Sequence, residues 1–259
     1  MGGDRFKEQF ALRAAFLKDQ GLDYAFDRPE ATEPSPAKAA PISPEKHSPP
    51  SPAVTTKVSE AAPPAAQGDP AARLRDIRAE IGDCQRCPLC QGRTQIVFGV
   101  GDPRAKILFV GEGPGAEEDR KGEPFVGRAG QLLTDIITKG MGLKRPEVYI
   151  ANVVKCRPPD NRVPEPEEMA ACLPFLEAQI NAIRPQVIVA LGATAVHGLL
   201  GVKVQITKFR GEWTNYKGTP LMPTFHPSYL LRNPAAKKEV WSDIQEVMRK
   251  VGIPVPGKG

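Results

Sequence analysis

Short apolar runs alternate with segments of helical periodicity along the last three quarters of the chain. Runs with the length and composition of buried strands occur at 106–111, 147–154, 186–192 and 221–225, the last weakened by Pro223. Apolar residues at the spacing of one helix face predict helices at 71–81, 129–141, 167–183, from just after Gly192, and at 240–251. Strands that alternate with helices are typical of a parallel sheet covered on both faces, so we expect an α/β fold.

Polar and glycine-rich features follow the predicted strands at the points where those strands end. They are the stretch Gly-Glu-Gly-Pro-Gly at 111–115, Asn152, the stretch 192–194 and His226. In parallel sheets a ligand binds beyond the carboxyl ends of the strands. A single active site would bring these four features together, so we place the candidate site at that edge of the sheet.

The N-terminal quarter of the chain has a different composition. Between residues 28 and 70, 11 of 43 residues are Pro and 9 are Ala, and large apolar residues are scarce. Such a segment cannot bury enough apolar surface to offset the entropy of ordering its backbone, so we expect a disordered linker. Residues 1–27 carry apolar positions typical either of a short amphipathic helix or of marginal local structure. The folded domain is therefore expected at residues 71–259.

Charge is distributed unevenly between these parts. Residues 1–70 hold 8 Lys and Arg against 10 Asp and Glu, whereas residues 71–259 hold 27 against 20. A basic folded domain favours a polyanionic partner such as nucleic acid, although a soluble surface with a mild basic bias would give the same numbers. No run of about 18 apolar residues predicts a membrane span. The N-terminus lacks the apolar core of a secretion signal, so we expect a cytoplasmic protein.

The five cysteines are the candidate metal ligands. Cys84, Cys87 and Cys90 form a Cys-x2-Cys-x2-Cys group before the first strand, and Cys156 and Cys172 follow the second. In a reducing compartment such thiols are expected to be ligands or free rather than disulfide-bonded. Four thiolates suit tetrahedral zinc or a [4Fe–4S] cluster, and a pair-plus-pair layout alone favours zinc. The wide second pair weakens a zinc ribbon, and the spacing leaves open which of the first three cysteines are ligands.

Taken together, these motifs resemble those of the iron–sulfur uracil-DNA glycosylases, often called family 4. The matching stretches are 111–115, 124–133, 152–162 and 226–234, in that order and with the cysteines at matching places, so the resemblance covers about 84–252. It implies a three-layer α/β/α sandwich with a central four-stranded parallel sheet. It also implies a [4Fe–4S] cluster on Cys84, Cys87, Cys156 and Cys172, with Cys90 as a spare thiol beside it.

The resemblance also implies roles for the residues at the strand ends. The amide of Asn152 would read the uracil edge, since it offers both a donor and an acceptor. Phe125 would stack on the base, and His226 would donate a hydrogen bond to the uracil O2 as charge builds there. Glu112 would help to hold uracil or water. Gly113 would line the pocket, at the place where better-known uracil glycosylases carry a water-orienting Asp. Without the resemblance, Asn152 would be a turn cap and Phe125 a core residue.

Further residues are secondary candidates. Glu118 and Asn161 are expected to pair and shape the pocket, although a solvated acidic helix start explains Glu118 equally well. The loop that resembles a DNA-entering wedge supplies four predicted DNA contacts, Leu231, Arg232, Lys237 and Lys238. Additional phosphate contacts are expected from the basic residues near Cys156, namely Lys155, Arg157 and Arg162, for which simple solvation is the alternative.

Three hypotheses follow for the function. The first is a monofunctional enzyme of base excision repair that hydrolyses the N-glycosidic bond of deoxyuridine in DNA. The second is a protein that captures uracil-containing DNA without turnover, as in a related group with an inserted Lys-Arg-Arg-Ile-His stretch; residues 123–130 carry no such insert. The third is a zinc protein with a nucleotide-binding α/β domain. The expected partner is uracil-containing DNA, single- or double-stranded, bound by a monomer.

Overall fold

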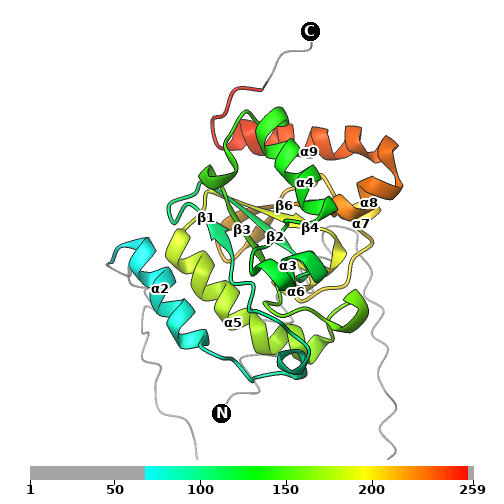
Figure 1. The fold of residues 1–259 in the computed structure, drawn as a ribbon. Coiled ribbons are helices and arrows are strands. Elements are labelled where there is room, and N and C mark those ends of the chain that lie inside the picture. The colour runs from blue at the N-terminus through cyan, green and yellow to red at the C-terminus, as the bar shows by residue number, and fades with distance from the viewer. Residues whose placement is uncertain (1–67, 256–259) are drawn as a thin grey trace, which may run out of the picture. The chain divides into compact units, whose positions relative to one another are not determined.

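The computed structural model describes residues 68–255, which include the segment predicted to fold (Figure 1). The predictions for residues 1–27, and for nearly all of the linker at 28–70, lie outside the described residues. The last residue of the predicted linker, Pro70, is the first residue of helix α2 (Pro70–Ile81), and Asp69 is the N-cap of that helix.

A six-stranded sheet forms the centre of the domain, in the order β1-β3-β2-β4-β6-β5. The four inner strands, β3 (Tyr149–Asn152), β2 (Ile107–Gly111), β4 (Val187–Leu191) and β6 (Thr219–Thr224), are parallel to one another. The predicted central four-stranded parallel sheet is therefore confirmed. Two short antiparallel strands, β1 (Val100–Gly101) and β5 (Thr214–Tyr216), extend it at the edges.

Pro223 lies within an inner strand, although a proline cannot donate a hydrogen bond to a strand ladder. The neighbouring strand β5 pairs with β6 only from Thr219 to Leu221. Beyond Leu221 that side of β6 carries no strand partner, and the carbonyl of Pro223 accepts a hydrogen bond from the amide of Gly211 at 3.0 Å. The proline is therefore tolerated because the edge strand ends before it.

Helices cover both faces of the sheet, as an α/β/α sandwich requires (Figure 1). One face packs against α4 (Arg128–Asp135), α8 (Pro227–Arg232) and α9 (Lys237–Lys250), and strand residues such as Ile107 and Phe109 share one apolar core with them. The other layer contains α2, α5 (Pro166–Ile183) and α6 (Ala193–Leu200). Because side chains alternate along a strand, the buried Leu108 and Val110 point toward this second layer.

The remaining described elements are short. The helix predicted at 129–141 is formed by α4 and a π-helical turn, η2 (Ile136–Gly140). The others are η1 (Pro88–Gln91), α3 (Ala116–Lys121), η3 (Arg145–Glu147), η4 (Pro159–Asn161), α7 (Ile206–Phe209) and η5 (Pro234–Ala236). Among the helices of residues 68–255, none combines the length and the apolar character needed to cross a membrane.

Candidate active site

A cavity of about 340 Å³ lies at the carboxyl ends of the four parallel strands. This volume falls in the range of roughly 300–1,000 Å³ that is usual for small-molecule sites. Every residue predicted to act in catalysis or to bind the base lines this one cavity: Glu112, Gly113, Glu118, Phe125, Asn152, Asn161 and His226. The structure therefore brings together side chains that are separated by up to 114 positions in the sequence, as the parallel topology predicts.

Asn152 is the last residue of β3, and its side chain is 1% exposed. Its Oδ1 is the single buried side-chain polar atom in the described part of the chain that lacks a hydrogen-bond partner. An unsatisfied buried acceptor costs about 1–3 kcal/mol, so its presence calls for an explanation. Gly111, the last residue of β2, leaves space for this oxygen, since a Cβ on residue 111 would lie 2.5 Å from it.

Phe125 forms another wall of the cavity and is 6% exposed. Its backbone has a φ of 54°, a left-handed conformation that costs an aromatic residue about 1–3 kcal/mol. The ring lies against the end of β2, because a Cβ on Gly111 would be 2.5 Å from the Phe125 Cζ. The ring centroid is 5.6 Å from that of the His226 imidazole, at an interplanar angle of 38°. The strained backbone thus presents an aromatic face beside Asn152 and His226.

His226 follows β6 and caps the N-terminus of α8. Its Nδ1 accepts a hydrogen bond from the backbone N–H of Ser228 at 3.2 Å, and the Ser228 hydroxyl lies 2.7 Å from the same nitrogen. Burial, assisted by Arg232, lowers the pKa of His226 to about 4, so the ring is neutral at pH 7. A neutral ring whose Nδ1 accepts must carry its proton on Nε2. The imidazole is therefore a neutral hydrogen-bond donor.

Glu112 directly follows β2 and also lines the cavity. Burial raises the pKa of its carboxyl group, while a hydrogen bond with the Thr194 side chain at the start of α6 lowers it. Thr194 stands in the stretch 192–194 that follows β4, so the loops after two neighbouring strands hold one carboxyl group between them. Burial is the larger of the two effects, so the pKa of this carboxyl group lies above its usual value.

Glu118 and Asn161 both line the cavity, but the hydrogen bonds of their side chains are with other residues and not with each other. Glu118 Oε1 accepts from the backbone N–H groups of Val126 and Gly127, both at 2.9 Å. Asn161 Oδ1 accepts from Arg157 Nε at 2.9 Å, and Asn161 itself has a φ of 55°. Glu118 therefore holds the loop that carries Phe125, and Asn161 belongs to a second strained wall of the cavity.

The predicted DNA-contacting residues lie on the surface, on α8 and at the start of α9. Leu231 is 40% exposed, which makes it one of the few large apolar side chains on the described surface. Arg232, Lys237 and Lys238 are exposed as well. The two lysines stand in the first turn of α9, where a positive charge opposes the helix dipole. Intrahelical stability does not account for them, and an anionic partner would.

Lys155 does not belong to such a surface, and its prediction as a phosphate contact is wrong. The side chain is 2% exposed, and its Nζ donates to the carbonyl of Asn152 at 2.9 Å and to Gln179 Oε1 at 2.6 Å. Burial lowers its pKa to about 8. Of the other two predicted contacts, Arg162 is largely engaged with Glu168, through hydrogen bonds of 2.8 and 2.7 Å. The apolar run before Lys155 was the signal of its burial.

Four of the five cysteines surround one small cavity, which shares no lining residue with the cavity at the strand ends. They are the four predicted ligands, Cys84, Cys87, Cys156 and Cys172, and Cys90 is not among its lining residues. All five are free thiols. Burial raises the pKa of Cys172 to about 11 and that of Cys156 in the same direction. In the described residues no three His, Cys, Asp or Glu side chains form a group that could hold a metal ion.

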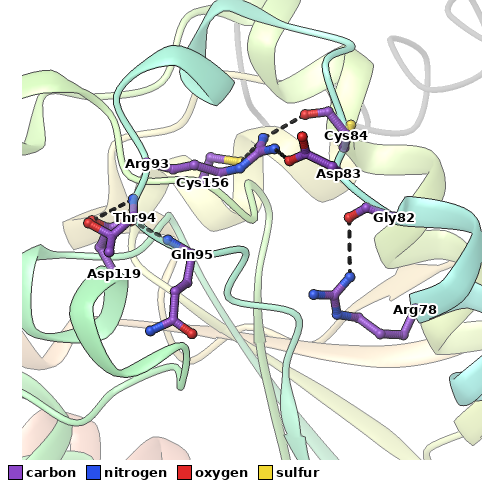
Figure 2. Close-up of polar contacts among 9 residues, drawn as sticks. All are labelled: Arg78, Gly82, Asp83, Cys84, Arg93, Thr94, Gln95, Asp119 and Cys156. Atoms are coloured by element: carbon purple, nitrogen blue, oxygen red, sulfur yellow. Dashed lines mark hydrogen bonds and ion pairs between the residues drawn. The ribbon is translucent and has the colours of Figure 1, made fainter.

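Hydrogen-bond donors face two of these sulfur atoms. Arg93 Nη1 donates to Cys156 Sγ at 3.4 Å and to the carbonyl of Cys84 at 2.6 Å, and the same guanidinium bonds Asp83 (Figure 2). The backbone N–H of Lys155 donates to Cys172 Sγ at 3.3 Å. Donors of this kind favour the thiolate form over the thiol. These donors partly offset the burial that raises the pKa of Cys156 and Cys172, and four cysteines around one cavity are the side chains that a [4Fe–4S] cluster would use.

The segment after Arg93 is fixed to the active-site side of the domain. Both carboxylate oxygens of Asp119 accept from the backbone N–H of Thr94, at 2.9 and 3.0 Å, and one also accepts from that of Gln95 at 3.4 Å (Figure 2). Asp119 lies on α3 next to Glu118, which holds the Phe125 loop. The short helix α3 thus connects the cysteine-bearing segment with the cavity wall.

Sequence reasoning missed several residues of this arrangement. Ser228 stands two positions after His226, where a residue entering a helix can return a hydrogen bond, so the local sequence contained a signal for it. Arg145 contacts the Phe125 loop from 20 residues away and carries no local signal. Contacts of this second kind depend on how η3 packs against α4, which periodicity does not reveal.

Comparisons with known proteins agree with this geometry. The model of the uracil DNA glycosylase superfamily matches residues 98–245. The type-4 uracil-DNA glycosylase of Thermotoga maritima is 56% identical over 165 residues, which are 62% of this chain and 84% of that protein. The Archaeoglobus fulgidus type-4 enzyme is 42% identical over 193 residues, 71% of this chain and 96% of its own length.

Relatives of another type match less closely. The type-5 uracil-DNA glycosylase of Thermus thermophilus is 34% identical over 151 residues, 51% of this chain and 68% of that protein. The type-4 proteins therefore share more residues with this chain over a longer stretch. The chain belongs to the uracil DNA glycosylase superfamily and, within it, to the type-4 uracil-DNA glycosylases.

Proposed function

We propose that this protein hydrolyses the N-glycosidic bond of deoxyuridine in DNA, releasing uracil and leaving an abasic site. One observation carries the proposal: the buried Oδ1 of Asn152, a residue that lines the cavity at the strand ends, has no hydrogen-bond partner among residues 68–255. A base that enters the cavity with an N–H group toward Asn152 would satisfy that oxygen. Uracil offers the N3–H for this purpose and the O4 for the amide nitrogen.

Discrimination against cytosine follows from the same amide. Cytosine presents an acceptor at N3 and a donor at N4, so the Asn152 amide, oriented for uracil, would face like groups. A buried polar group left unpaired costs about 1–3 kcal/mol, which is roughly a factor of 10–100 in binding. The base must first leave the duplex stack, because the cavity lies inside the domain and the glycosidic bond is inaccessible in a helix. Phe125 would then provide a stacking surface.

His226 would stabilise the departing uracil anion. Its Nε2–H is the free donor of a neutral ring, since Nδ1 is occupied by Ser228. A donor placed where negative charge develops is worth about 10²–10³ in kcat at comparable oxyanion sites. A neutral donor also avoids pairing a full positive charge with the neutral substrate, so its hydrogen bond strengthens mainly as the bond to the sugar breaks.

Glu112 would act on the opposite charge. As uracil leaves with the bonding electrons, the deoxyribose ring becomes positively charged, and a nearby carboxylate stabilises it and the water that attacks it. Gly113 lies beside it, where a side chain would collide with Val154 because a Cβ there would be 2.7 Å from Val154 Cγ2. The position next to Glu112 therefore carries no side chain that could act on the sugar or the water, and Glu112 is the acidic residue we assign to this step.

Leu231 would fill the space vacated by the flipped nucleotide, with Arg232, Lys237 and Lys238 on the phosphates. This assignment is supported by the exposure of Leu231 and by the two lysines at the start of α9, where an anionic backbone would offset their unfavourable position. The partner is uracil-containing DNA in single- or double-stranded form, and a single chain carries all the proposed groups.

A [4Fe–4S] cluster would be held by Cys84, Cys87, Cys156 and Cys172. This is supported by the convergence of the four cysteines on one cavity and by the donors that Arg93 and Lys155 direct at their sulfur atoms. Such a cluster supplies a cross-link between four thiolates rather than a reacting group, because hydrolysis transfers no electrons. Thiolate ligands persist in a reducing compartment, which supports action in the cytoplasm.

The test uses an oligonucleotide with one uracil, incubated with purified protein and then treated with alkali. Strand breakage at uracil, absent when thymine or cytosine replaces it, is the expected result. A stable complex without breakage would instead indicate capture without turnover. The absence of both breakage and a complex would overturn the proposal. The visible spectrum of the same preparation tests the cofactor separately, since an iron–sulfur protein is coloured and a zinc protein is not.

A further inference from the structure

The backbone around Phe125 is held by two side chains of opposite charge that come from different elements. Arg145 of η3 directs one nitrogen, Nη2, at the carbonyl oxygens of Pro124 and Phe125, at 2.7 and 3.0 Å. Glu118 of α3 accepts from the next two amides along the chain. Four backbone groups between Pro124 and Gly127, one before the Phe125 Cα and three after it, are therefore bonded to side chains.

Further contacts hold Arg145 itself. Its second nitrogen, Nη1, donates to Thr134 Oγ1 at 2.9 Å, and Thr134 in turn donates to the carbonyl of Gly130 on α4. Gly130 allows α4 to approach the loop, since a Cβ there would lie 2.0 Å from the carbonyl carbon and oxygen of Phe125. The guanidinium is thus oriented from one side by α4 while it binds the loop on the other.

These bonds address the one feature of the loop that is energetically unfavourable. Phe125 adopts a φ of 54°, which an aromatic residue rarely keeps unless its surroundings impose it. In an extended conformation the ring would leave the end of β2, and the cavity would lose that wall. Carbonyl and amide groups fixed on both sides of the Cα leave the left-handed conformation as the one that keeps all four bonds.

We infer that Arg145 is a positioning residue of the active site, which together with Glu118 clamps Phe125 in its left-handed conformation and so presents the ring to the extruded base. The inference rests on the proposed function insofar as the ring is a stacking surface for uracil. Arg145 is not among the residues that line the cavity, so we expect its effect on catalysis to pass through the loop that carries Phe125. The clamp is made entirely by side chains of this domain.

The test is a double-mutant cycle with Arg145→Gln, Phe125→Leu and both together. Glutamine cannot bond two carbonyls and Thr134 at once, and leucine removes the stacking face. Each single variant should lower kcat/KM for uracil release by about tenfold, the order of one base–aromatic stack, and should raise the inhibition constant of free uracil. Because Arg145 acts through Phe125, the double variant should be no more than about threefold worse than Phe125→Leu. Multiplying effects, near a hundredfold, would overturn the inference.

Two further variants separate positioning from a loss of charge or of folding. Arg145→Lys can place one ammonium where Nη2 stands, so it should recover part of the activity that Arg145→Gln loses. If Arg145→Gln does not fold, Arg145→Lys replaces it in the double-mutant cycle with Phe125→Leu. Arg249→Gln is the matched control, because Arg249 is an exposed arginine paired with Glu246 on α9 and should behave as wild type. Equal losses in Arg145→Lys and Arg145→Gln would contradict a positioning role for the cation.

Hydrogen exchange tests the clamp without any reference to activity. The amides of Val126 and Gly127 should be protected in the wild type, should exchange at least about tenfold faster in Arg145→Gln, and should be unchanged in Arg249→Gln. Unchanged protection in Arg145→Gln would overturn the clamp even if activity fell. A wild-type protein that fails to cleave uracil-DNA but shows the predicted exchange would overturn the proposed function and leave the clamp standing.

Discussion

Gly111→Ala places one methyl group at the point where the floor of the cavity is most crowded. The new Cβ would lie 2.5 Å from both Asn152 Oδ1 and Phe125 Cζ, whereas ordinary contacts begin at 3.4 Å. Each neighbour must therefore move by about 0.9 Å. Gly111 has no positive φ, so alanine fits the backbone and the effect comes from crowding alone.

The expected cost can be divided between stability and activity. Overpacking of this kind destabilises a protein by about 1–3 kcal/mol, which the domain should survive. Displacing a group in the catalytic geometry by about 1 Å costs roughly 10²-fold in rate. Gly111→Ala should therefore remain folded and lose about 10²-fold in kcat/KM. Single-turnover release of uracil from a labelled oligonucleotide and a thermal melt of the same preparation measure the two quantities.

Gly92→Ala is the control, because a Cβ at Gly92 meets nothing within 4 Å. Its activity should equal that of the wild type. If Gly111→Ala kept wild-type kcat/KM in a folded protein, the placement of Asn152 and Phe125 against the end of β2 would not matter to the reaction, and the reasoning about this cavity floor would be refuted.

Four further predictions concern other parts of the site. Asn152→Leu should lose about 10²-fold in kcat/KM yet raise the melting temperature without DNA, because an unpaired buried acceptor is removed; a lower melting temperature would contradict this. His226→Gln should lower kcat by about 10²–10³, and an inflection near pH 6.5 that vanishes in this variant would contradict a neutral imidazole. The pKa of His226 is about 4 in the folded protein, so the unfolded state binds more protons between pH 6.5 and 4. The free energy of unfolding should therefore fall as the pH falls through that window, by up to about 1.4 kcal/mol per pH unit. The fall should be smaller in His226→Gln, and urea denaturation measures it in both proteins. Leu231→Ala should slow cleavage in duplex DNA several-fold more than in single strands, and equal slowing would argue against a wedge. Cys172→Ala should abolish the visible absorption of the protein and lower its melting temperature, whereas Cys90→Ala should leave both unchanged.

The inner sheet could be predicted because three of its strands lie in continuous apolar runs, and the fourth, β6, keeps a short apolar stretch despite Pro223. The edge strands could not, because β1 and β5 contain two and three residues and alternate too briefly to give a pattern. They form through pairing with β3 and β6, which is tertiary information. The π turn after α4 was invisible for the same reason, since apolar residues recur there at helical spacing whichever hydrogen bonds the backbone makes.

The candidate site divides in a similar way. Residues at strand ends, such as Asn152 and His226, could be placed together because the topology fixes where strand ends meet. Lys155 was misplaced because a basic residue next to other basic residues suggests an exposed surface, and its partner Gln179 lies on α5, 24 positions away. The left-handed conformation of Phe125 was likewise hidden, since the residues that impose it, Glu118 and Arg145, are distant along the chain.

The two adjacent carboxylates of α3 have a consequence for how the protein fails. Asp119 binds the amides that follow Arg93, and Glu118 binds those that follow Phe125, so a single helical turn anchors the cysteine segment and the cavity wall together. Damage that releases the cysteine segment removes a support of the stacking wall within the same turn. The two parts of the protein should therefore fail together, so that loss of the cysteine segment would be felt as loss of uracil release.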